Sequence, residues 1–259
     1  MGHAPSATLT YNGAVLGRRD KMKEPKRFPV GVERGAGGYS SAWCYDLPGC
    51  YALVPLNANV EERMRIAILE FLSWSHNRAS EHLLVDANQV EIAQVVDTGV
   101  NVAAGESHAF FLDDSGAVGQ SEFPGWANPH DLALDQLREL ALALPEGMRE
   151  LPFARGGSTI LGTVAHCAET EALYANQLRP GIFSAFRDPG PIRRLQEAHL
   201  MLQQVVCDVP PDLRIRRDSP SDHAFEEWSV RKVMRRSIWH LRYHTWEVRE
   251  AVSRIWLPG

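Results

Sequence analysis

Residues 228–248 read WSVRKVMRRSIWHLRYHTWEV, and this stretch decides the fold of the second half of the chain. Small or apolar residues and two histidines recur at helical spacing along it and just beyond it, at Val230, Val233, Ser237, His240, His244, Val248 and Ala251. Residues at this spacing lie on one face of a helix, and valine and alanine on that face are typical of a bundle interior. The stretch therefore predicts a helix over about 228–256 whose two histidines point inward.

The two histidines of this helix are spaced for metal binding. His240 and His244 are one turn apart, so both rings can bind one ion. A third histidine, His166, lies among small and polar residues in an earlier predicted helix. Three neutral imidazoles would hold a first-row divalent metal and leave a coordination position for water or substrate. The alternative is that these are surface histidines or satisfied core histidines, since the HxxxH spacing alone is common.

Each of four further side chains near these positions has either a role at the metal site or an ordinary structural role. Glu169 and Glu247 each lie one turn beyond a candidate ligand and can accept the distal N–H of its ring; the alternative is a solvated carboxylate. Cys167 is expected to be a small buried hydrophobe rather than a ligand. His199, on another predicted helix, can line the same cavity, although a position outside it is favoured.

The chain before Gly125 has the pattern of a small α+β domain. Asn59 is the expected N-cap of a helix from Val60 to about Asn77. Alternating or β-branched runs predict strands over 28–33, 39–45, 50–54, 90–96 and 108–112. These elements predict a small antiparallel sheet with one helix over residues 28–124. Residues 1–27 are interpreted as a peripheral tail or edge strand, whose basic stretch is solvated rather than a nucleic-acid arm.

The chain after Gly125 has the pattern of an all-α four-helix bundle, predicted over residues 125–259. Proline and glycine separate four helical segments, over about 128–144, 158–178, 191–206 and 228–256. Asn128 or His130 is expected to start the first of them and Ser158 to cap the second. Short breaks between helices fit an antiparallel arrangement.

Composition narrows the class of protein. The chain has 259 residues, 44% hydrophobic and 23% charged, which is typical of a globular protein with more than one domain. Its net charge of -5 argues against a nucleic-acid-binding function. No apolar run approaches the roughly 18 residues that a membrane span needs. The first residues lack the pattern of a signal peptide and the four cysteines form no CxxC pair, so we expect a cytoplasmic protein.

The two histidine-bearing helices resemble those of the DinB-like superfamily (DinB/YfiT type), a group of metal-binding four-helix bundles. The family pattern has one histidine in the second helix and an HxxxH pair in the last. Here Gly162-Thr-Val-Ala-His166-Cys-Ala-Glu-Thr-Glu171 resembles the first element, and Ile238-Trp-His240-Leu-Arg-Tyr-His244, preceded by Trp228 to Val233, resembles the second. The resemblance covers about residues 126–256.

The resemblance implies a divalent metal ion, nickel, zinc or iron, on His166, His240 and His244. Some members are thiol-dependent transferases that use low-molecular-weight thiols such as bacillithiol or mycothiol, and others have amidohydrolase or isomerase chemistry. In a transferase the metal would lower the pKa of the thiol, and in a hydrolase it would generate hydroxide from water. Many members pair through their bundles, so the resemblance also allows a homodimer.

The first half of the chain resembles the HicB-like domain. The resemblance rests on Tyr39-Ser-Ser-Ala-Trp-Cys-Tyr-Asp46-Leu-Pro-Gly-Cys50 followed by a helix, and covers about residues 28–77. HicB-like antitoxins usually carry a DNA-binding segment where this chain has the predicted bundle, so an antitoxin function is disfavoured. In physical terms, 46–49 is a tight hairpin turn and Cys50 a strand residue that faces a small core. Residues 85–124 match neither resemblance and are read as an extension of the sheet.

Two classes of function follow from these observations. The first is a metal-dependent hydrolase or thiol-dependent transferase that acts on a small molecule. The second is a non-catalytic metal-dependent sensor or partner-binding module, with the HicB-like domain as its contact surface. An enzyme needs an acid, a base or an oriented nucleophile beside the open coordination position, and the sequence identifies none. Catalytic residues therefore stay unassigned.

Overall fold

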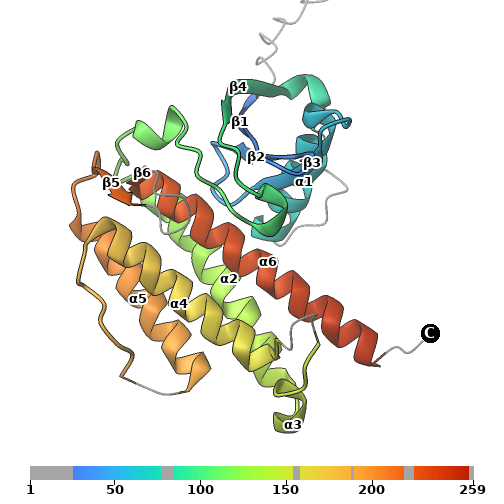
Figure 1. Cartoon of the computed structure of the whole chain (residues 1–259), viewed down its shortest axis with the longest axis vertical. Coiled ribbons are helices and arrows are strands. Elements are labelled where there is room, and N and C mark those ends of the chain that lie inside the picture. Colours follow the sequence, from blue (N-terminus) through green and yellow to red (C-terminus); the bar gives the residue numbers. More distant parts are fainter. Residues whose placement is uncertain (1–25, 77–84, 154–157, 188–189, 219–224, 257–259) are drawn as a thin grey trace, which may run out of the picture.

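The computed structural model describes residues 26–76, 85–153, 158–187, 190–218 and 225–256. It consists of an α+β region followed by a mainly helical region, as the sequence predicts (Figure 1). Most of the tail predicted for residues 1–27 lies outside the described residues. Its last two residues, Lys26 and Arg27, are exposed and pair with Asp46 and Glu91. Within the described ranges, no helix is long and apolar enough to cross a membrane.

The α+β region is a four-stranded sheet with one helix. Its elements are β1 (Phe28–Arg34), β2 (Tyr39–Cys44), β3 (Tyr51–Pro55), α1 (Val60–His76) and β4 (Val90–Asp97). The predicted cap of α1 is confirmed, because the side chain of Asn59 accepts the N–H of Glu62 at 2.7 Å. Three short 3-10 turns follow in the same half, at Ala87–Gln89, Val102–Ala104 and Asp113–Ser115.

The sheet is mixed, with the order β3-β2-β1-β4, so the prediction of an antiparallel sheet is wrong at one edge. β1 pairs antiparallel with β2 and β2 with β3, whereas β4 runs parallel to β1. Parallel neighbours require a crossover connection. The crossover here is the segment that contains α1, which carries the chain from β3 to the opposite edge of the sheet.

The strand predicted over 108–112 does not form. The amides of His108 and Ala109 instead donate to the carboxylate of Glu33 on β1, at 2.8 and 3.0 Å. A carboxylate thus takes the hydrogen bonds that a neighbouring strand would accept. The alternating pattern in this segment reflects burial of alternate residues, including Ala109, without a strand partner.

Four long helices form the second region and pack side by side (Figure 1). They are α2 (Phe123–Ala143), α4 (Ile160–Leu178), α5 (Pro191–Asp208) and α6 (Val230–Trp256), with the single turn α3 (Glu146–Arg149) between the first two. α2 begins earlier than predicted, because Pro124 fits its first turn and Pro129 is accommodated inside it. The cap of α4 is Thr159 rather than Ser158, since its hydroxyl accepts the N–H of Gly162 at 2.9 Å.

The sequence did not predict the hairpin that precedes α6. Its strands are β5 (Arg214–Asp218) and β6 (Phe225–Ser229), which pair antiparallel. β5 contains three arginines and an aspartate, so it lacks the apolar alternation that identifies a strand. β6 leads directly into α6 and therefore sets where that helix begins.

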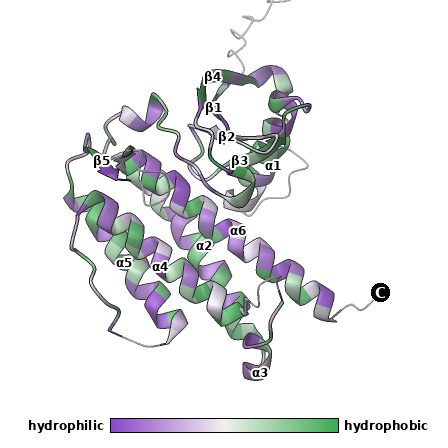
Figure 2. Ribbon diagram, in the orientation of Figure 1, coloured by the Kyte–Doolittle hydropathy of each residue, from purple (hydrophilic) through white to green (hydrophobic). Residues whose placement is uncertain are grey.

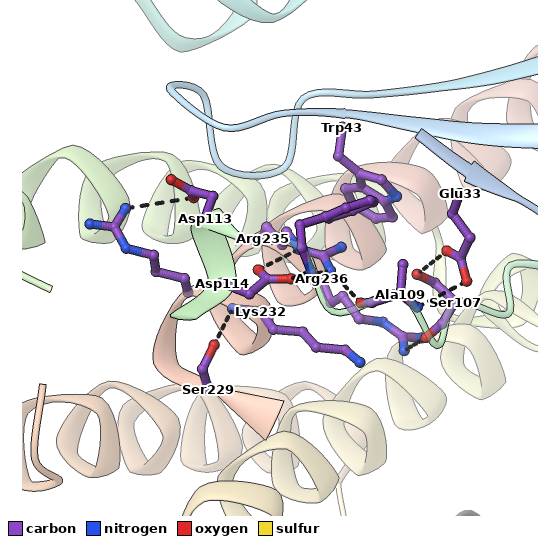
Figure 3. A network of polar contacts seen from close by, with 12 residues as sticks. Glu33, Trp43, Ser107, Ala109, Asp113, Asp114, Ser229, Lys232, Arg235 and Arg236 are labelled. Carbon is purple, nitrogen blue, oxygen red and sulfur yellow. Dashed lines mark hydrogen bonds and ion pairs between the residues drawn. The ribbon is translucent and has the colours of Figure 1, made fainter. Parts of the chain in front are cut away.

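α6 lies between the sheet region and the other helices (Figure 1). It carries many hydrophilic residues (Figure 2), some of which are fully buried and paired. Arg235 donates to both carboxylate oxygens of Asp114, at 2.9 and 3.0 Å, and to the carbonyl of Ala109 (Figure 3). Beside this pair, Trp239 of α6 packs edge-on against Trp43 of β2 with ring centroids 5.6 Å apart. The two regions therefore share a buried interface along one face of α6.

Candidate metal centre

The predicted stripe on α6 faces the interior of the bundle. Val233, Ser237 and Val248 are fully buried, and His240 is 8% exposed. The helix α6 thus positions its histidines as the sequence pattern indicated. His166 comes from α4, which packs against α6, and its ring is exposed on the pocket side of the group.

The three predicted histidines converge. Nε2 of His240 lies 3.1 Å from Nε2 of His166 and 3.1 Å from Nε2 of His244. In a tetrahedral site a metal ion about 2.0–2.1 Å from each nitrogen keeps the nitrogens about 3.3 Å apart. The three rings therefore need only small shifts to bind one ion, and the group fits a divalent metal.

Hydrogen bonds and burial make these three rings suitable metal ligands. Nδ1 of His244 lies 2.6 Å from Oε2 of Glu247, to which it donates a hydrogen bond. The proton is therefore on Nδ1, and the lone pair of Nε2 points toward the other histidines. Burial, together with the neighbouring His244 and His166, lowers the pKa of His240 well below its usual value. Burial also lowers the pKa of His166. Neutral rings of this kind are the form that binds a metal.

The two predicted outer carboxylates have different partners. Glu247 contacts a candidate ligand directly, as described above. Glu169 instead accepts a hydrogen bond from Arg194 of α5 at 2.9 Å, and its side chain is largely exposed. Cys167 is fully buried in the core between the helices, in agreement with its prediction as a small hydrophobe.

The histidines open into a pocket of about 400 Å³ between the two regions. One wall comes from the loop that contains Ser107 and His108, and the other from α4 and α6. The aromatic side chains of Trp239 and Tyr243 also line it, together with Arg236 and Glu226. The sequence did not predict this loop as a wall of the site.

A second group of candidate ligands lies deeper in the bundle. His130, Glu171 and His199 place ligand atoms within 4.8 Å of one another, and all three are buried. Burial raises the pKa of Glu171, but His130 and His199 lower it further, so this carboxyl is ionised. The sequence pattern predicted His130 only as a helix start, and Glu171 carried no local signal of a ligand. The available signal was the position of His130 on the same face of α2 as buried Leu134 and Leu137.

Compared with protein families, curated proteins and solved structures, the chain matches none. The resemblances to DinB-like and HicB-like proteins therefore stay predictions. What supports a function is the geometry of the two histidine groups and of the pocket.

Proposed function

We propose that this chain is a DinB-like metal-dependent enzyme, a hydrolase or a thiol-dependent transferase, that acts on a small molecule. The observation that carries the proposal is the convergence of three histidine Nε2 atoms at the wall of a pocket of about 400 Å³. This volume lies within the range of small-molecule sites, roughly 300–1,000 Å³. Nickel, zinc or iron are the metals that this ligand set accepts.

Each residue of the centre has a role in this proposal. His166, His240 and His244 hold the ion, and Glu247 keeps the ring of His244 in its tautomer and orientation. A divalent ion bound there would act as a Lewis acid and would lower the pKa of a water molecule or a thiol beside it. Trp239 and Tyr243, which line the pocket, would contact the apolar part of a substrate.

Metal analysis of the full chain without a histidine tag tests the centre. We expect the wild type to retain a divalent metal in this centre and His166→Ala to lose it. Glu169→Gln is the matched control on the same helix, because Glu169 contacts Arg194 and should leave the metal in place. Equal metal content in wild type and His166→Ala, with both folded, would overturn the proposed centre.

Turnover assays then separate the reaction classes. Metal-dependent hydrolysis of amides or esters without added thiol would identify a hydrolase. Consumption of a low-molecular-weight thiol together with an electrophile, only by the metal-loaded protein, would identify a transferase. A tightly bound metal with neither activity across both screens would instead favour the non-catalytic sensor.

A further inference from the structure

One residue from each of the four long helices meets at the centre of the bundle. They are His130 of α2, Glu171 of α4, His199 of α5 and Ser237 of α6. The side chains of the first two and of Ser237 are fully buried, and His199 is 2% exposed. The three candidate ligands do not line the pocket that holds His166, His240 and His244.

Glu171 lies between the two histidines of this cluster. Its Oε2 is 2.8 Å from Nε2 of His130 and 3.7 Å from Nδ1 of His199. The hydroxyl of Ser237 lies 2.7 Å from the same Nε2 of His130 and also donates to Glu171. Ligand atoms that share one ion with bonds of about 2.0–2.2 Å are about 3.3 Å apart in a tetrahedral site, so the two shorter contacts would lengthen and the longer one would shorten around an ion. Two nitrogens and two oxygens therefore surround a volume that one small cation can occupy after modest shifts.

The ring of His199 is oriented from outside the cluster. Its Nε2–H donates to Asp131 at 2.8 Å, and Gln203 also donates to Asp131. This hydrogen bond turns Nδ1 of the ring toward Glu171, and an outer carboxylate orients a ligand histidine in the same way in carboxylate–histidine–metal sites. Burial lowers the pKa of His199, but Glu171 and Asp131 raise it further, above its usual value. The ring is therefore oriented as a ligand, and an ion bound at Nδ1 would take the place of a proton.

Hydrogen bonding within the protein leaves one nitrogen of each of the two histidine rings without a partner. Within the described part of the chain, Nδ1 of His199 and Nδ1 of His130 are buried and have no hydrogen-bond partner. A distance of 3.7 Å is too long for a hydrogen bond from Nδ1 of His199 to Glu171. Buried ring nitrogens without partners are rare and costly, and a cation would satisfy the one that faces Glu171.

We propose that His130, Glu171 and His199 form a second site for a divalent metal, closed to solvent, with Ser237 as a neighbouring oxygen donor. Two imidazoles, a carboxylate and a hydroxyl are a nitrogen and oxygen ligand set that suits zinc and other first-row divalent ions. Because all of its ligands are buried, an ion in this site exchanges slowly, and it ties the four helices together.

Zinc stoichiometry in four proteins tests this second site. The full-length wild type, Glu171→Gln, His244→Ala and Glu169→Gln are stripped of metal, reloaded with zinc alone and freed of excess zinc by gel filtration. We expect two equivalents in the wild type and in Glu169→Gln, whose replaced carboxylate is exposed on the same helix. We expect one equivalent in Glu171→Gln and one in His244→Ala. Chelator should remove the equivalent that remains in His244→Ala slowly.

The possible outcomes separate the second site from the proposed function. An equivalent that persists in His244→Ala supports the buried site even where Glu171→Gln fails to fold, because His244→Ala leaves the buried cluster intact. No zinc in folded His244→Ala would overturn the buried site. One equivalent in the wild type that His244→Ala keeps and Glu171→Gln loses would support the buried site and overturn the pocket site.

Discussion

The hydroxyl of Ser107 donates to the carboxylate of Glu33 at 2.6 Å, and this bond joins the sheet to the wall of the candidate pocket. Glu33 also accepts from Thr98 and from the amides of His108 and Ala109. On the other side, Arg236 of α6 donates to the carbonyl of Ser107 (Figure 3). The loop beside the histidines is therefore held by a buried strand carboxylate on one side and by cationic side chains of α6 on the other, Arg236 and Arg235 among them.

We expect Glu33→Gln to destabilise the fold by about 2–4 kcal/mol near neutral pH, because the buried donors around Glu33 lose an ionised acceptor. Burial raises the pKa of Glu33, but hydrogen bonds from Ser107, Thr98 and the backbone lower it further, below the usual 4.5. A lowered pKa in the folded state contributes stability above the usual value and loses it as pH falls through the folded value. The difference between wild type and variant should therefore shrink below about pH 4.5.

Denaturant unfolding across pH measures this difference. Glu91→Gln is the control, because Glu91 is exposed on the neighbouring strand and pairs only weakly with Arg27. A difference between wild type and Glu33→Gln that stays constant from pH 7 to pH 3 would contradict the expected ionisation of Glu33.

Glu247→Gln should weaken metal binding by about 10–100-fold, because Glu247 orients the ring of His244. Glu169→Gln should leave the affinity unchanged, since its carboxylate contacts Arg194. Titration of metal-free protein with zinc against a chelating indicator measures both. Equal loss in the two variants would indicate that the charge of the carboxylate matters and not its contact with the ring.

Asp114→Ala should destabilise the protein by about 3–5 kcal/mol, because it leaves the buried guanidinium of Arg235 without its carboxylate. Asp135→Ala breaks a surface pair with Arg138 and should change the stability by less than about 1 kcal/mol. Denaturant unfolding monitored by tryptophan fluorescence measures both changes, since Trp43 lies against Arg235. Similar small losses in the two variants would show that the interface tolerates an unpaired arginine.

Gly49→Ala should destabilise the fold more than Gly37→Ala does. Both glycines have positive φ, 85° and 79°, so both substitutions strain the backbone. A methyl group at 49 would also lie 2.4 Å from a side-chain carbon of Ile238, whereas one at 37 meets nothing within 4 Å. The contact with α6 should add about 1–3 kcal/mol to the loss at Gly49. Equal decreases in melting temperature in the two variants would mean that α6 shifts to accommodate the methyl group without loss of stability.

The sequence predicted the elements whose signal lies within one segment. The stripe on α6 and the cap at Asn59 are local patterns, so the inward histidines and the start of α1 follow from them directly. His166 could be added because α4 carries a histidine among small residues.

Features that depend on partners far apart in the sequence could not be read in this way. The amide of His108 donates to Glu33, and no local pattern shows that a carboxylate replaces a strand there. His130 and Glu171 meet across two helices, and each alone resembles an ordinary helix residue. The direction of β4 likewise depends on the crossover through α1 and not on the composition of the strand.

The packing of Trp43 against Trp239 has a consequence for synthesis on the ribosome. Trp43 is translated early, whereas α6 follows every other described helix and strand in the chain. Until α6 emerges, the face of the sheet that carries Trp43 has no cover from Trp239. Nascent chains that stop before α6 should therefore expose an aromatic surface to chaperones, which release it once the last helix docks.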